Sequence, residues 1–154
     1  MTTHIFDVWL LAASGIQLGT LWIMKLSILP MLNALPYNRY VNTCQLIDMH
    51  TFHPIAVWNG LLAAGAGILQ AYMVGDAVAS PLYVVGSLGM LVVGITSEGF
   101  NRPIWRQIEK WSPVNVAEEW NEKRYRWHFA HQVRTYGAIL AVACYAAAMI
   151  TAGA

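Results

Sequence analysis

Charged side chains are scarce in this chain, and their scarcity limits what the protein can be. Only 11% of the 154 residues are charged, whereas 57% are hydrophobic, and the mean hydropathy is positive. A soluble domain of this length usually carries about twice that share of charge. The composition therefore argues against an ordinary soluble domain and indicates a membrane protein.

Cysteine is almost absent, with Cys44 and Cys144 as the two thiols of the chain. Cys44 is expected near one membrane face and Cys144 deep in the last apolar run, so we predict no disulfide between them. Two separated thiols also argue against a cysteine-rich zinc site and against an iron–sulfur cluster.

The first residues, "MTTHIFD", lack the lysine or arginine that normally precedes the apolar core of a secretory signal peptide. The apolar run that follows is also longer than the core of such a peptide. We therefore predict that this run is a permanent helix.

Four apolar runs are long enough to cross a bilayer, which takes roughly 20 residues. They extend from about Val8 to Leu29, from Phe52 to Met73, from Pro81 to Ile95 or a little beyond, and from Val133 to Ile150. Backbone groups inside a bilayer must be hydrogen-bonded within their own segment, so each run predicts a helix. The expected fold is all-α: one integral membrane domain, residues 1–154, built as a bundle of four transmembrane helices.

The basic residues are distributed very unevenly over the connections between these runs. With four spans, both termini and the second connection share one side of the membrane, and the other two connections share the opposite side. All nine basic residues belong to that opposite side: Lys25, Arg39, Arg102, Arg106, Lys110, Lys123, Arg124, Arg126 and Arg134. The positive-inside rule makes this side cytoplasmic. We therefore predict that both termini are non-cytoplasmic, in the cytoplasmic membrane if the protein is bacterial, with a long cytoplasmic loop, about 101–126, between the third and fourth spans.

Two histidine pairs are the main candidate for chemistry. Residues 48–54 read "DMHTFHP" and residues 127–132 read "WHFAHQ". The topology brings His50, His53, His128 and His131 to the cytoplasmic level together with Glu98, and helical residues three apart share a face. Imidazoles and a carboxylate are good ligands for first-row transition metals. These five residues are therefore predicted to hold iron or copper, as one or two ions.

Other polar residues at this level are candidates for supporting roles. Asn101 and Arg134 are predicted to orient the substrate or bound oxygen, and Glu98 is predicted to serve as a metal ligand or as a proton acceptor. Gln17, deeper in the first span, is a weaker candidate for lining a pocket.

The long loop is rich in aromatic residues. Within "PIWRQIEKW", the residues Ile104, Trp105, Ile108 and Trp111 fall roughly on one helical face. The tryptophans suit an aromatic belt at the membrane interface. The alternative is a cap over a site at the cytoplasmic end.

Three stretches together resemble a known family: "MLNALPYNRYVNTCQLIDMHTFHP", "EGFNRPIWRQIEKW" and "WHFAHQVRT". They are similar to the small four-helix membrane proteins grouped with the fungal anthrone oxygenases. The resemblance implies dioxygen as a co-substrate, and it implies that residues 101–103 and the segment 127–135 flank the functional site. His131 stands where many members carry asparagine, which would fit a metal-dependent branch.

The leading hypothesis from the sequence is therefore an integral membrane, metal-dependent oxidoreductase or oxygenase acting on a small apolar or aromatic substrate. A haem-binding electron carrier and a non-enzymatic membrane protein that binds metal or lipid are the alternatives. The expected partners are the bilayer and a small-molecule substrate, without nucleic acid. Small-residue stretches such as "GLLAAGAGI" would suit close helix packing within the bundle or in a homo-oligomer.

Transport is the least favoured alternative. A carrier needs a polar path across the whole membrane, and the outer half of the predicted bundle offers almost no polar residues.

Overall fold

A computed structural model describes the backbone of residues 2–50 and 53–152 and the side chains of residues 5–47 and 57–152. In this part all regular secondary structure is helical, which confirms the all-α prediction. The elements in chain order are α1 (Thr2–Ile23), η1 (Met24–Ile28), α2 (Leu29–Ala34), α3 (Tyr37–His50), α4 (His53–Val74), α5 (Ala79–Thr96), η2 (Ser97–Asn101), α6 (Arg102–Ile108) and α7 (Trp120–Ala152).

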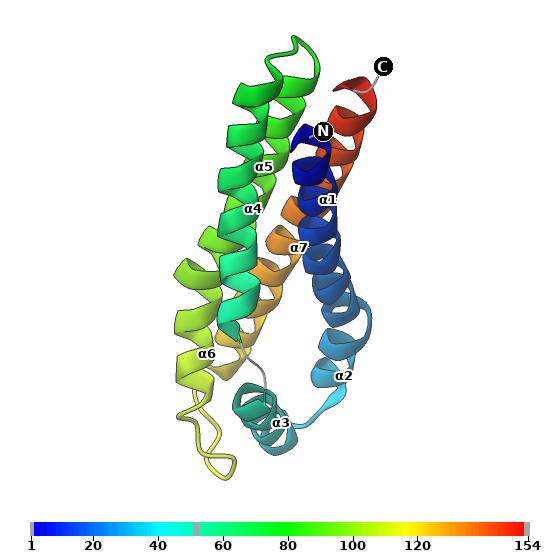
Figure 1. Ribbon diagram of the computed structural model, residues 1–154. Helices are drawn as coiled ribbons and strands as arrows, with labels where there is room; N and C mark the ends of the chain where they lie inside the picture. Colours follow the sequence, from blue (N-terminus) through cyan, green and yellow to red (C-terminus); the bar gives the residue numbers. More distant parts are fainter. Residues whose placement is uncertain (1, 51–52, 153–154) are drawn as a thin grey trace.

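Four helical segments are long and apolar enough to cross a membrane: Ile5–Ala34, Val57–Val74, Ala79–Ile108 and Trp120–Ala152. α1 packs against α4 and α7, and α5 packs against the same two helices, so the four form a closed ring. Both termini and the α4–α5 turn lie at one end, here called the outer end (Figure 1). α3 and the loop between α6 and α7 lie at the other, here called the inner end.

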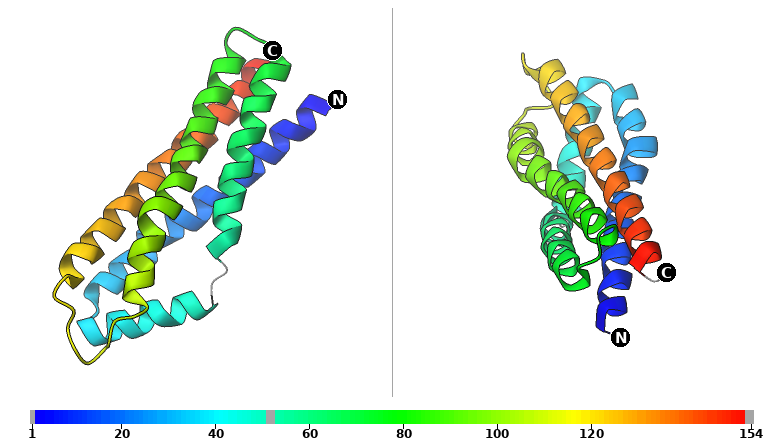
Figure 2. Two further views of the ribbon diagram at one scale, coloured as in Figure 1. Left: turned by 90° about the vertical axis from the view of Figure 1, so that its left-hand side faces the viewer. Right: turned by 90° about the horizontal axis from the view of Figure 1, so that it is seen from above.

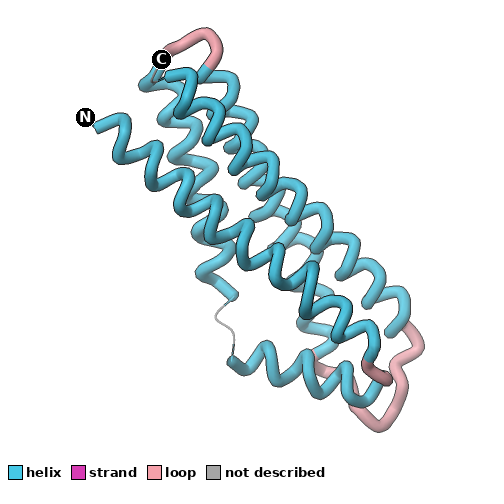
Figure 3. Tube along the Cα trace, turned by 90° about the vertical axis from the view of Figure 1, so that its right-hand side faces the viewer, coloured by secondary structure: helices cyan, strands magenta, loops and turns pink. Residues whose placement is uncertain are grey.

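The third segment is longer than its apolar run predicted, and the fourth begins well before its apolar run, as the absence of a helix breaker from residues 116–131 predicts. The third continues through η2 and α6 to Ile108, and α7 begins at Trp120. The irregular connection is therefore residues 109–119, less than half of the predicted loop. Figure 3 shows this loop and the α4–α5 turn at opposite ends of the bundle.

α3 is a helix that the hydropathy pattern did not predict. It follows Pro36 and lies across the inner end of the bundle (Figure 2, left). Its face toward the bundle carries Tyr40, Val41 and Cys44, each at most 1% exposed, at the three- and four-residue spacing of one helical stripe. α3 thus covers the inner end as a floor.

Two turns with π-helical hydrogen bonding interrupt the long segments near the inner end. The N–H of Leu29 donates to the carbonyl of Met24 in η1, and that of Arg102 donates to the carbonyl of Ser97 in η2. A proline follows closely each time, at Pro30 and Pro103. A proline lacks the N–H for an ordinary α-helical bond, and its ring displaces the carbonyl four residues earlier, which favours a widened turn.

The α4–α5 turn at the outer end depends on Gly75 and Asp76. Gly75 has a φ of 61°, in the left-handed region. Asp76 Oδ1 accepts hydrogen bonds from the N–H groups of Ala79 (2.7 Å) and Val78 (2.8 Å). These bonds cap α5 and lower the pKa of the Asp76 carboxyl.

Replacing Gly75 with alanine is expected to destabilise the bundle by about 1–2 kcal/mol, because an L-residue pays that much to adopt the left-handed region. A Cβ at Gly75 would meet no atom within 4 Å, so the loss comes from the backbone alone. Thermal unfolding of detergent-purified protein, followed by circular dichroism, measures the effect. The control is Gly15→Ala, at a helical glycine with equally open space. An unchanged melting temperature for Gly75→Ala would contradict the turn geometry.

Candidate functional site

Arg134 and His131 form the centre of the polar site at the inner half of the bundle. They lie one turn apart on α7, and the Arg134 Nη2 is 2.9 Å from the His131 Nδ1. The His131 Nε2 is 3.0 Å from the carbonyl oxygen of Leu21 on α1. The His131 side chain is fully buried. We call this group and its neighbours the Arg134 centre.

These two hydrogen bonds determine the tautomer of His131. A carbonyl oxygen can only accept, so Nε2 must carry the hydrogen, and a guanidinium can only donate, so Nδ1 must be the acceptor. The imidazole is therefore neutral, and both of its nitrogens are engaged. In this arrangement His131 has no lone pair left for a metal ion or for the iron of a haem.

Ser97 and Asn101 approach Arg134 from η2. The Nη1 of Arg134 donates to the hydroxyl of Ser97 at 3.2 Å. In the amide orientation that satisfies both groups, the Asn101 oxygen lies 2.9 Å from the Nε and 3.0 Å from the Nη1 of Arg134. A π-helical turn is wider than an α-helical one, so it places residues four apart on one face and turns residues three apart onto different faces.

The charge of Arg134 has no negatively charged partner among the described side chains. Its acceptors there are Ser97, Asn101 and His131, which are all neutral. These contacts involve all three guanidinium nitrogens, so its hydrogen bonds are met by neutral groups while its positive charge is not balanced. Charges inside a membrane bundle are costly and usually have a partner. The site is therefore electrostatically suited to a small anion.

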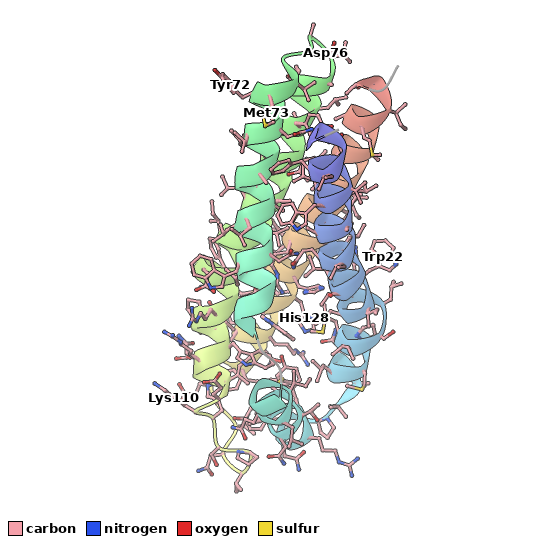
Figure 4. All side chains as sticks on the ribbon, in the orientation of Figure 1. Trp22, Tyr72, Met73, Asp76, Lys110 and His128 are labelled. Atoms are coloured by element: carbon pink, nitrogen blue, oxygen red, sulfur yellow. The ribbon has the colours of Figure 1, made fainter. Side chains whose placement is uncertain are left out.

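His128 lies one turn before His131 on α7. Figure 4 shows it between the helices near the lower end of α4, whereas Trp22 and Lys110 lie on the outside. Its Nδ1 is 3.3 Å from the Asn33 Nδ2. Its Nε2 is buried and has no hydrogen-bond partner among the described residues. This nitrogen is available to donate or accept a proton.

Glu98 does not join the histidines. It forms an ion pair with Arg102, one turn along the chain, and 40% of its side chain is exposed. The sequence placed Glu98 and Asn101 on one face because they are three residues apart, and the π-helical turn η2 separates them. Glu98 as a metal ligand or proton acceptor is therefore not supported by its position.

The predicted metal centre is only partly within the described structure. The side chains of His50 and His53 lie outside the described residues. Within the described ones, no three His, Cys, Asp or Glu residues converge on a point where a metal could bind. The described half of the predicted set does not fit a metal centre, because His131 is fully hydrogen-bonded and Glu98 faces Arg102. Iron or copper binding stays a prediction that depends on His50 and His53.

Aromatic side chains adjoin the site on its inner side. The ring centroids of Trp105 on α6 and Trp127 on α7 are 5.2 Å apart, and both side chains are buried. Ile104 and Ile108 are buried with Trp105, as the predicted helical face required. Trp105 and Trp127 thus belong to the interior rather than to an interfacial belt, which favours the predicted cap.

Cys44 and Tyr40 on α3 complete the floor beneath this aromatic cluster. Burial raises the pKa of the Cys44 thiol to about 12, and burial also raises the pKa of Tyr40. Both groups are therefore protonated at neutral pH, so the Cys44 thiol is not a thiolate nucleophile there.

The outer half contains buried polar residues that the sequence reading missed. Asp7 is 6% exposed, Gln70 and Tyr83 are fully buried, and Ser87 is 2% exposed. Asp7 was placed just outside the first span, but α1 begins before it. The expectation that the outer half offers almost no polar groups is therefore wrong. The composition of the outer half no longer argues against the passage of ions. The rotation of each helix about its axis decides this burial, and hydropathy alone does not show it.

A comparison with protein-family models, curated proteins and solved structures finds no match to this chain. The similarity to the anthrone oxygenase group therefore stays an expectation from the quoted motifs.

Proposed function

We propose that the protein is an integral membrane oxidoreductase that binds a small aromatic substrate through an ionised oxygen at Arg134 and oxidises it with dioxygen. The observation that carries the proposal is the guanidinium of Arg134, half-buried among apolar helices with neutral acceptors only. An uncompensated buried charge is strongly destabilising. A substrate oxygen with negative charge would complete the site.

The orientation follows from the basic residues. They belong to the inner half of the bundle, and the outer turn, residues 75–78, has none. We propose that the inner end is cytoplasmic and that both termini are outside. The Arg134 centre then lies toward the cytoplasmic side of the bilayer.

The aromatic neighbours support a flat substrate. Trp127 lies one turn before His131 on α7, so the two side chains share a face. Planar ligands stack favourably on indole rings, and Trp105 extends the same apolar surface. The substrate class that combines these features is a planar aromatic compound with a phenol or an enolisable ketone.

The proposed reaction converts a methylene group that is conjugated with a carbonyl through an aromatic ring into a second carbonyl. A base takes one proton from the methylene, and the resulting enolate oxygen pairs with Arg134. The methylene carbon then reacts with dioxygen, gains one oxygen atom and loses its hydrogens, and one water molecule leaves. One dioxygen is consumed, and no other reductant is required.

His128 is the proposed base. Its Nε2 can accept a proton when Nδ1 carries the hydrogen. In that tautomer Nδ1 donates to Asn33, whose amide is then turned so that its oxygen is the acceptor. Iron or copper, which the sequence predicts through His50 and His53, is not part of any step proposed here.

The first test is oxygen uptake by detergent-purified protein supplied with anthrone, an enolisable planar ketone. We expect the native protein to consume one dioxygen for each anthrone that it oxidises. Asn101→Asp places a carboxylate against Arg134, and this internal anion should weaken the binding of the enolate by about 10–100-fold, the worth of a charge-assisted hydrogen bond. Equilibrium binding of a hydroxyanthraquinone, followed by absorbance, measures that change.

Two controls make this test specific. Glu98→Gln should leave binding unchanged, because Glu98 pairs with Arg102 away from the site. Binding of anthracene, which has no ionisable oxygen, should be insensitive to Asn101→Asp. Absence of oxygen uptake together with equal hydroxyanthraquinone binding by the native protein and Asn101→Asp would refute the proposal.

A further inference from the structure

Buried polar groups continue from the Arg134 centre to the outer end along one face of α1. This face presents Asp7, Ser14 and Gln17 and then the carbonyl of Leu21, and these four residues are at most 6% exposed. Their spacing keeps them on the side of α1 that faces the bundle. At 1.5 Å per residue the stripe covers about 21 Å. We call these groups and their hydrogen-bond partners the polar seam.

The outer part of the polar seam consists of a carboxyl and several hydroxyl groups. Asp7 Oδ1 accepts hydrogen bonds from the Gln70 Nε2 (2.7 Å) and the Tyr83 hydroxyl (2.5 Å). A second group lies beside them, where the Tyr145 hydroxyl is 3.2 Å from the Ser87 Oγ and these two hydroxyls also contact the carbonyls of Ala63 and Tyr83. Carboxyl and hydroxyl groups both donate and accept hydrogen bonds. A proton can therefore pass between oxygens within each group, and its passage from one group to the other requires a bridging water.

The middle of the polar seam is formed by two amides. The Asn59 Nδ2 donates to the carbonyl of Ala13 (3.0 Å) and lies 3.5 Å from the Gln17 Oε1. Amides do not take up protons at neutral pH, but they can hydrogen-bond water molecules, and hydrogen-bonded waters can relay a proton. Below them, the Leu21 carbonyl accepts from His131, where the seam joins the Arg134 centre.

We propose that the polar seam is a proton path from the outer end to the Arg134 centre. The positive charge of Arg134 then prevents protons from continuing to the inner end. Each step moves one proton between neighbouring oxygens or waters, and nothing is oxidised or reduced. A fixed guanidinium repels an excess proton, as arginine does in water-conducting pores. An anion bound at Arg134 would cancel this charge and open the path.

The proposal does not depend on substrate oxidation, and proton flux tests it separately. The protein is reconstituted into vesicles of phosphatidylcholine and phosphatidylglycerol that contain a trapped pH-sensitive dye. A potassium gradient with valinomycin drives the protons. We expect native protein to conduct little more than protein-free vesicles, and Arg134→Gln to conduct at least about tenfold more, because the repelling charge is gone.

Double variants identify the route. Adding Asp7→Asn or Tyr83→Phe to Arg134→Gln should return the flux to the native level, and Tyr83→Phe keeps the aromatic ring. Adding Asp76→Asn, an exposed carboxyl at the same end, should leave the raised flux unchanged. Arg134→Lys keeps the charge and should stay closed.

Retention of a trapped sugar-sized dye by the Arg134→Gln vesicles excludes a general leak, and gel filtration in detergent checks that each variant is folded. Two results would overturn the proposal. One is an Arg134→Gln flux equal to that of the native protein. The other is a raised flux that survives both Asp7→Asn and Tyr83→Phe.

Discussion

Replacing Gly89 with alanine is expected to lower the stability of the bundle by about 1–3 kcal/mol or more, the usual cost of forcing an extra group into a packed interior. A Cβ on Gly89 would lie 2.6 Å from the carbonyl oxygen of Gly137 and 3.2 Å from the backbone nitrogen of Ala141. These are backbone atoms of α7, which cannot rotate away as a side chain can. The helices α5 and α7 would have to separate along their whole contact.

Thermal unfolding in detergent measures this loss, with a fall of about 2–4 °C expected for each kcal/mol in a chain of this size. The matched control is Gly65→Ala in α4, where an added Cβ meets no atom within 4 Å. That variant should be neutral or slightly stabilising, because alanine is the better helix former. Equal melting temperatures for the two variants would show that α5 and α7 do not touch through their backbones at Gly89.

Replacing Arg134 with lysine is expected to reduce kcat/KM for the oxidation by about 100-fold, which corresponds to about 2.7 kcal/mol of transition-state stabilisation. Ser97, Asn101 and His131 contact the guanidinium through its three nitrogens and so fix its position. A lysine ammonium is a single point of charge and cannot keep these contacts and a substrate oxygen together. The charge would remain, but its position and orientation would be lost.

Oxygen uptake at several substrate concentrations separates kcat from KM in this variant. The control is Arg126→Lys on the same helix, because Arg126 pairs with Glu122 and more than half of its side chain is exposed. Exposed pairs contribute little, so Arg126→Lys should keep native kinetics. An unchanged kcat/KM in Arg134→Lys would contradict this prediction, because it would show that a positive charge without the guanidinium geometry is sufficient for the oxidation.

Hydropathy and charge together predicted most of the architecture. The four apolar runs correspond to the four long helical segments, and their even number places both termini at one end. α3 was missed because its sequence is mostly polar and its apolar stripe is short. Tyr40, Val41 and Cys44 become recognisable as a buried face only when α3 is placed across the inner end.

The sequence predicted the depth of the site along the bundle but not the contacts within it. Arg134, His131 and Asn101 do lie together, as their shared depth indicated. The partner of His131 on α1 is the carbonyl of Leu21, a backbone group that no sequence motif marks. Glu98 was assigned to the site because an α-helix was assumed through residues 97–101, and the π-helical turn changes which residues face inward.

The turns η1 and η2 also bear on how this chain would align with others. A π-helical turn holds one residue more than the α-helical turn it replaces, so each is equivalent to a single-residue insertion in an otherwise regular helix. Relatives without the insertion would align with a one-residue gap near Lys25 or Glu98. Beyond the gap the residues of such relatives would keep their facing, because the widened turn absorbs the extra residue. A regular α-helix of the same length, without a gap, would instead rotate every later residue by about 100°, one α-helical residue step, and the position of Asn101 would then no longer face that of Arg134.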